Sequence, residues 1–188
     1  MSSRRCLRGI ATAIGLLVGV PAGSAAAQPI NCAGLDSVEP DLTMPTVTGC
    51  FDVWVQGPTD SARIVGFARS EGYKPPISLW SLTLITPGGE SSLSLQFGGT
   101  RPPMGPHQIV DLRGTPDNDL PPNRFAAAGV VDPARPVPDG FHAVSGDVII
   151  LTSQPDLVVG TFTYVGRKEE TGERVTVTGA FRAVNKEN

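Results

Sequence analysis

The chain has 188 residues, with 15 basic and 18 acidic side chains and a formal net charge of −3. An acidic balance argues against nucleic acid as a partner, because affinity for phosphates depends on clustered Lys and Arg that release counterions. Gly and Pro are frequent, at 22 and 18 residues, but 40% hydrophobic residues are too many for a disordered chain. The composition therefore favours a β-sheet protein with many turns.

The first 27 residues have the three parts of an export signal. These are a basic head (Arg4, Arg5 and Arg8), an apolar body (10–20) and small residues before a cleavage site (25–27). The apolar body is much shorter than the roughly 20 residues that span a bilayer. We therefore expect residues 1–27 to be a signal peptide and residues 28–188 to be one exported domain, periplasmic or extracellular, without a transmembrane segment.

Loss of this segment changes the charge of the mature chain. It removes three arginines and no acid, so the formal charge becomes about −6. The Arg4–Arg5 pair partly matches a twin-arginine signal, whose cargo crosses the membrane already folded. Arg8 departs from that pattern, where an apolar residue is commoner, so the twin-arginine and general secretory routes both stay open.

Hydrophobic residues of the mature chain alternate with polar ones, and no segment keeps the helical spacing of 3.6 residues for three turns. This pattern predicts an all-β fold: a single antiparallel β-sandwich of about eight to ten strands, with a flattened β-barrel as the alternative. A hairpin is predicted across 87–90. The predicted strands are 51–56, 63–68, 80–84, 92–97, 108–112, 125–131, 146–152, 158–164 and 175–181.

The last three predicted strands should form a meander. In the final hairpin we expect Gly160 to face Gly179, with Phe162 and Phe181 placed diagonally over these glycines. The segment 145–152 is apolar on both faces, which predicts a central strand covered on both sides.

This C-terminal region resembles a known group of proteins. The stretches Ser145-Gly146-x-Val-Ile-Ile, Val159-Gly160-Thr161-Phe162-Thr163-Tyr164 and Val175-Thr176-Val177-Thr178-Gly179-Ala180-Phe181 are similar to the C-terminal signature of uncharacterised bacterial exported β-sheet domains. The resemblance covers residues 145–184 and implies an exported β-sheet domain. It transfers no catalytic residue, because the shared motif consists of packing residues.

Two cysteines remain after Cys6 leaves with the signal. Cys32 and Cys50 would lie in a compartment where disulfides persist, so we expect them to pair as a structural staple. A redox role is disfavoured because no C-x-x-C is present. Cys32 also lies too far beyond the apolar body for lipid attachment. Members of the similar group are often lipoproteins, so this chain departs from them here.

Recognisable catalytic signatures are missing from the sequence. It has no nucleophile elbow, H-E-x-x-H pair, phosphate-binding glycine loop or dinucleotide fingerprint, so no catalytic residue, metal or cofactor is predicted. Long proline-rich loops on a rigid sheet are where binding usually occurs. The weak ligand-binding candidates in or beside these loops are Arg101, His107, Asp117, Asp119, Arg124 and His142.

The preferred interpretation is a non-catalytic module that binds a small ligand, a glycan, a lipid or a protein partner. One alternative is a hydrolase using loop carboxylates, which requires two or more of a small set of side chains to meet in one cleft. That set is Asp117, Asp119, Asp139, Asp147 and His142. The other alternative is a structural envelope protein, which needs neither a pocket nor converging polar groups.

The predicted disulfide can be tested by substitution. Cys32→Ser in the mature chain should lower the free energy of unfolding by about 3 kcal/mol, because it frees a loop that the bridge closes. Denaturation with and without reductant measures this loss, and the difference from wild type should vanish in reductant. Thiol labelling of unfolded, unreduced wild type would contradict the pairing.

Overall fold

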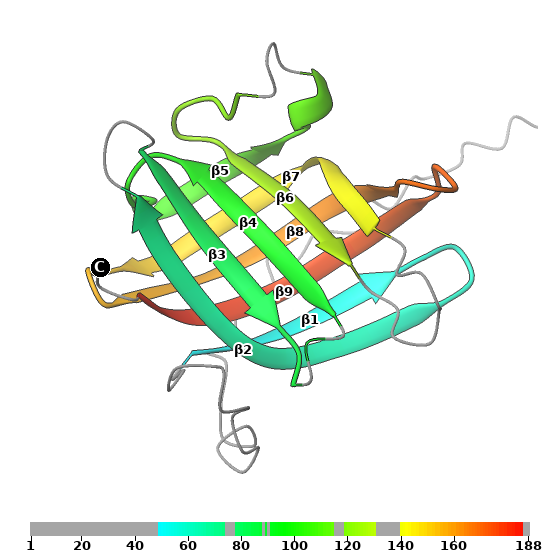
Figure 1. The fold of residues 1–188 in the computed structure, drawn as a ribbon, viewed down its shortest axis with the longest axis horizontal. Coiled ribbons are helices and arrows are strands. Elements are labelled where there is room, and N and C mark those ends of the chain that lie inside the picture. The colour runs from blue at the N-terminus through cyan, green and yellow to red at the C-terminus, as the bar shows by residue number, and fades with distance from the viewer. Residues whose placement is uncertain are drawn as a thin grey trace, which may run out of the picture.

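The computed structural model describes residues 49–73, 78–87, 89, 91–114, 119–130 and 140–185. Residues 1–27 and Cys32 lie outside these ranges, so the signal peptide and the disulfide stay predictions. Nine strands in one sheet confirm the all-β prediction, and the described residues contain no α-helix (Figure 1). One 3-10 turn, η1, spans Leu112–Gly114.

Nine strands follow one another along the described part of the chain. They are β1 (Cys50–Gln56), β2 (Ser61–Tyr73), β3 (Leu79–Ile85), β4 (Ser92–Gly98), β5 (Gly105–Val110), β6 (Phe125–Val130), β7 (Gly140–Ser153), β8 (Leu157–Lys168) and β9 (Arg174–Asn185). The β3–β4 hairpin and the β7–β8–β9 meander are confirmed. The strand predicted at 108–112 instead begins at Gly105, because β7 pairs with the Gly–Pro residues that resemble a turn.

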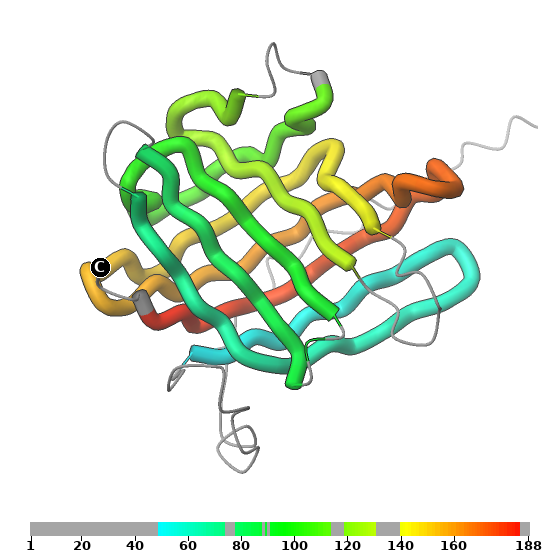
Figure 2. The backbone as a smooth tube through the Cα atoms, in the orientation of Figure 1, coloured from blue at the N-terminus to red at the C-terminus, as the bar shows by residue number. Residues whose placement is uncertain are grey.

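The hydrogen-bonded order of the strands is β1-β2-β3-β4-β6-β5-β7-β8-β9, and it closes on itself because β1 also pairs with β9. Cys50 accordingly pairs with both Phe67 and Arg182. Figures 1 and 2 show β3, β4 and β6 crossing in front of β7, β8 and β9. Most neighbours are antiparallel, but β5–β6 and β2–β9 make short parallel contacts that the prediction of an antiparallel sheet did not include.

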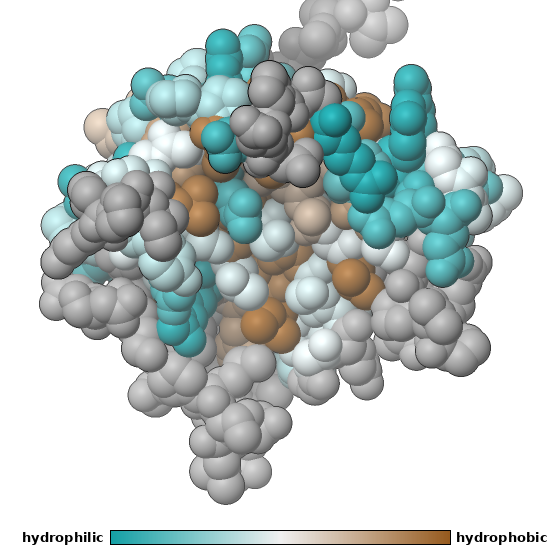
Figure 3. All heavy atoms as spheres, turned by 45° about the horizontal axis from the view of Figure 1, so that its top comes forward, coloured by the Kyte–Doolittle hydropathy of each residue, from teal (hydrophilic) through white to brown (hydrophobic). Residues whose placement is uncertain are grey.

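Strand β7 differs from its prediction in one respect. It lies between β5 and β8, and Val148 and Ile150 are buried, yet Ile149 and Leu151 are each 45% exposed. The prediction that this strand is covered on both faces is therefore wrong. Its outer face stays at the surface. The face of the molecule in Figure 3 mixes hydrophobic and hydrophilic side chains.

Aromatic side chains fill much of the interior. Trp80 packs edge-on against Phe125, with ring centroids 6.2 Å apart, while Phe162 stacks on both Tyr164 and Phe181. The Tyr164 hydroxyl is buried without a hydrogen-bond partner in the described part of the chain. Burial raises the pKa of this hydroxyl far above its usual value, so Tyr164 acts as an uncharged core residue.

The final hairpin has a different register from the expected one. Gly160 faces Phe181 and Gly179 faces Phe162, so the expected Gly160–Gly179 pair is wrong. The cause lies in the loop, because Gly172 adopts a φ of 72° and its N–H donates to the Lys168 carbonyl at 3.1 Å. Gly172 is therefore a turn residue, and the strands pair two positions away from the predicted register.

Direct pairing of Phe with Gly recurs around the sheet. Phe51 faces Gly66, and Phe141 faces Gly129. A Cβ atom added to Gly129 would lie 2.7 Å from Phe141 Cζ, and one added to Gly66 would lie 2.9 Å from Phe51 Cε1. The rings thus occupy the space that a side chain would take, which compensates for the packing that glycine lacks.

This packing predicts a specific double-mutant cycle. Gly129→Ala should destabilise the protein by about 1–3 kcal/mol, because the added methyl overlaps the Phe141 ring. Phe141→Leu alone should also destabilise it, but the double variant should be more stable than the sum of the two losses predicts. Chemical denaturation of all four proteins measures the coupling, and strict additivity would contradict the contact.

Candidate functional site

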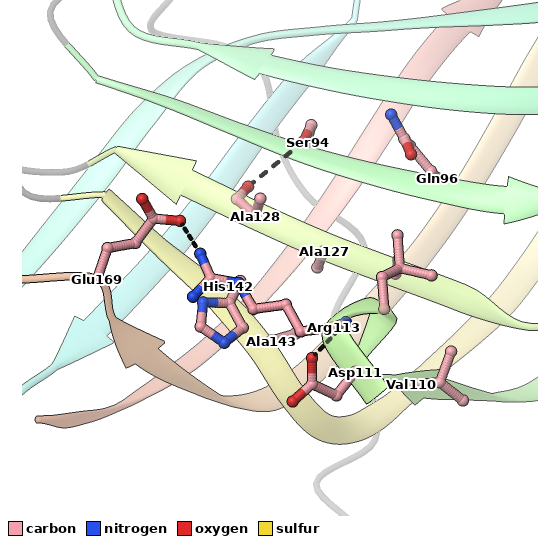
Figure 4. A pocket seen from close by; sticks show the side chains of 12 residues that line it. Ser94, Gln96, Val110, Asp111, Arg113, Ala127, Ala128, His142, Ala143 and Glu169 are labelled. Carbon is pink, nitrogen blue, oxygen red and sulfur yellow. Dashed lines mark hydrogen bonds and ion pairs between the residues drawn. The ribbon is translucent and has the colours of Figure 1, made fainter. Parts of the chain in front are cut away.

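A pocket of about 320 Å³ lies on the outer face of the sheet, between β4, β6 and β7 and the segment 110–113 that leads into η1 (Figure 4). Alternation explains its position: Leu93 and Leu95 point into the core, so Ser94 and Gln96 face outward. The lining residues are Ser94, Gln96, Val110, Asp111, Leu112, Arg113, Ala126, Ala127, Ala128, His142, Ala143 and Glu169.

An ion pair crosses the mouth of the pocket. Arg113 Nη2 donates to Glu169 Oε1 at 2.6 Å, which joins η1 to the loop after β8 (Figure 4). The Arg113 backbone N–H donates to Asp111 Oδ1 at 2.9 Å, and the Glu169 N–H donates to the Gly140 carbonyl at 2.8 Å. Both partners of the ion pair are about half exposed, so it adds less than about 1 kcal/mol to stability. Its effect is therefore mainly on shape.

His142 is a polar residue of β7 that lines the pocket. The alternation of side chains along β7 places it on the outer face. Its neighbours Phe141 and Ala143 are buried in the core, and its cross-strand partners are Ala128 and Arg167. The Nδ1 atom of His142 is buried and has no hydrogen-bond partner among the described residues. An unsatisfied buried polar group costs about 1–3 kcal/mol, so a bound group that supplies a partner would be favoured.

The other predicted site residues do not join His142. His107 Nε2 lies 2.8 Å from the Pro103 carbonyl oxygen, and its ring contacts Phe97 and Phe125 with centroids 5.4 and 5.7 Å away. His107 is therefore a packing residue at the border of the core. Arg124 donates to Gln108, whereas Arg101 and Asp119 are exposed and do not line the pocket. Asp117 lies outside the described residues.

The carboxylates of the hydrolase alternative do not gather in this pocket. Asp147 is exposed on β7, and neither Asp147 nor Asp119 lines the pocket with His142. Asp117 and Asp139 lie outside the described residues. In the described part of the chain, no group of three or more His, Cys, Asp and Glu side chains is placed to hold a metal. The same residues contain no helix with the length and apolarity of a membrane span.

Sequence reasoning missed three charged residues of the pocket: Asp111, Arg113 and Glu169. They come from the end of β5, from η1 and from the loop after β8, so only the fold brings them together. The sequence Asp111-Leu112-Arg113-Gly114 did carry a local signal, because an Asp side chain often accepts from the N–H two residues later in a turn.

Comparison of the chain with protein-family models, with curated proteins and with solved structures finds no match. The resemblance of residues 145–184 to exported β-sheet domains therefore gives no family assignment.

The packing role of His107 can be tested directly. His107→Ala should lower the free energy of unfolding by about 1 kcal/mol, because the ring contacts with Phe97 and Phe125 are lost. Thermal and chemical denaturation measure the change, with Arg101→Ala, at an exposed position, as the control. Equal stability of the two variants would contradict the packing role.

Proposed function

We propose that the chain is an exported, non-catalytic binding module that holds a small polar ligand in the pocket beside η1. One observation carries this proposal: the buried, unpartnered His142 Nδ1 belongs to a residue that lines a ligand-sized pocket. Small-molecule sites usually have volumes of about 300–1,000 Å³ and a few placed polar groups on an apolar lining. The alanines of β6 supply such a lining here.

We further propose that the sheet is a flattened barrel rather than a sandwich of two sheets. The continuous pairing from β1 round to β9 supports this, because a sandwich would interrupt the order at two edges. Aromatic rings pack over glycines inside the sheet, which favours a ligand site on the outer face. Export rests on the predicted signal peptide at residues 1–27, and the compartment is proposed as periplasmic or extracellular.

The hydrolase alternative has weaker support. Of the carboxylates in the pocket, Glu169 is engaged by Arg113 and Asp111 accepts a backbone N–H. A general acid and base pair would need both carboxylates free to exchange protons with a substrate.

Filling the pocket tests the proposal. Ala128→Leu places a larger side chain in the pocket lining, whereas Ala62→Leu makes the same change at an exposed position of β2. A thermal-shift screen of the mature protein against sugars, lipids and divalent ions should find a ligand that raises the melting temperature. Ala128→Leu should abolish that shift, and Ala62→Leu should keep it.

Two results would overturn the binding function. One is a wild-type melting temperature that no ligand class changes. The other is a ligand-induced shift that survives unchanged in Ala128→Leu, because the ligand would then bind elsewhere.

A further inference from the structure

We propose that the ligand of this pocket is a neutral polyhydroxylated molecule, either a free sugar or the terminal unit of a glycan. The proposal rests on the binding function proposed above and adds the chemical class of the ligand. It follows from the charge around the pocket, from the unused hydrogen-bonding groups and from the apolar lining.

Charges around the pocket are balanced. Asp111 and Glu169 contribute two negative charges to the lining, and Arg113 contributes one positive charge. Arg167 adds a second positive charge, because it pairs with His142 across β7 and β8 and therefore lies on the same face. Arg174, opposite Arg167 on β9, lies one strand farther away.

A charged ligand would gain little from this arrangement. An anion attracted to Arg113 meets Glu169, which already accepts from that guanidinium, and a nearby carboxylate in Asp111. A cation attracted to the carboxylates meets Arg113 for the same reason. A neutral ligand avoids both repulsions and leaves the Arg113–Glu169 pair intact.

Unused hydrogen-bonding groups of both kinds surround the pocket. The Gln96 carboxamide offers a donor and an acceptor, and Figure 4 marks no hydrogen bond between it and the other residues drawn. Asp111 keeps acceptor capacity beyond the one N–H it receives. His142 Nδ1 accepts or donates according to its tautomer. A hydroxyl group both donates and accepts, so adjacent hydroxyls on one ring match this mixed set.

The lining and volume limit the size of the ligand. The methyl groups of Ala126 and Ala128 give an apolar surface against which the C–H bonds of a sugar ring can pack. A volume of about 320 Å³ lies at the lower end of the roughly 300–1,000 Å³ that is usual for small-molecule sites. This accommodates one ring with its hydroxyls. Arg113 and Glu169 are about half exposed, so a further unit of a glycan would extend past them into solvent.

Isothermal titration of the mature protein tests the ligand class with hexoses, myo-inositol, glucuronate and glucosamine as probes. Neutral hexoses or inositol should bind at least tenfold more tightly than glucuronate and glucosamine. Gln96→Leu should weaken this binding at least tenfold, because it leaves a ligand hydroxyl unpaired. The matched control is Gln56→Leu, at an exposed position of β1, which should bind as wild type does.

The outcomes separate the ligand class from the binding function. Tighter binding of glucosamine or glucuronate, lost in Ala128→Leu, overturns the ligand class and leaves the function standing. Neutral sugars that bind Gln96→Leu and Ala128→Leu as tightly as they bind wild type overturn both. The absence of binding by every probe, in this titration and in the thermal-shift screen, also overturns both. Tighter binding of di- and trisaccharides than of monosaccharides assigns the ligand to a glycan end, and equal binding to a free sugar.

Discussion

Phenylalanine rings packed over glycines on the neighbouring strand constrain the register of three strand pairs, β1–β2, β6–β7 and β8–β9. Each ring needs a glycine directly opposite, as at Phe51–Gly66 and Phe181–Gly160. A slip of two residues would keep the inward face but place a ring against a side chain, so these pairs make each alternative register sterically costly. The Phe141–Gly129 pair also fixes the register that places His142 opposite Ala128, and both of these residues line the pocket.

The local pattern of the sequence was enough to predict strands but not their partners. Period-two alternation is contained within each strand, so all nine segments were identified. The register of a hairpin depends on which loop residue adopts the turn conformation. In the β8–β9 hairpin this residue is Gly172, which has a positive φ. Burial of the outer face of β7 was also predicted wrongly from local sequence. Ile149 and Leu151 are apolar, but they occupy positions that the sheet leaves at the surface.

The candidate site was harder to predict than the fold. His142 lies near Asp139 and Asp147 in the sequence, yet most of the residues that line the pocket with it come from other segments. His107 is one of two histidines in the chain and lies beside a proline-rich loop in the sequence, but its ring packs against Phe97 and Phe125. A binding site assembled from strand ends and loops depends on which distant segments the fold brings together. The spacing of residues within one segment does not predict this.

Pairing of β1 with β9 has a consequence for the order in which the protein folds. β1 can bond to β2 as soon as both have left the ribosome, but its second neighbour, β9, follows all the other described strands in the sequence. Contacts of such long range slow folding, and until they form one edge of β1 stays open. If the chain is exported unfolded, β9 arrives after the other eight strands, and the sheet cannot close before β9 arrives.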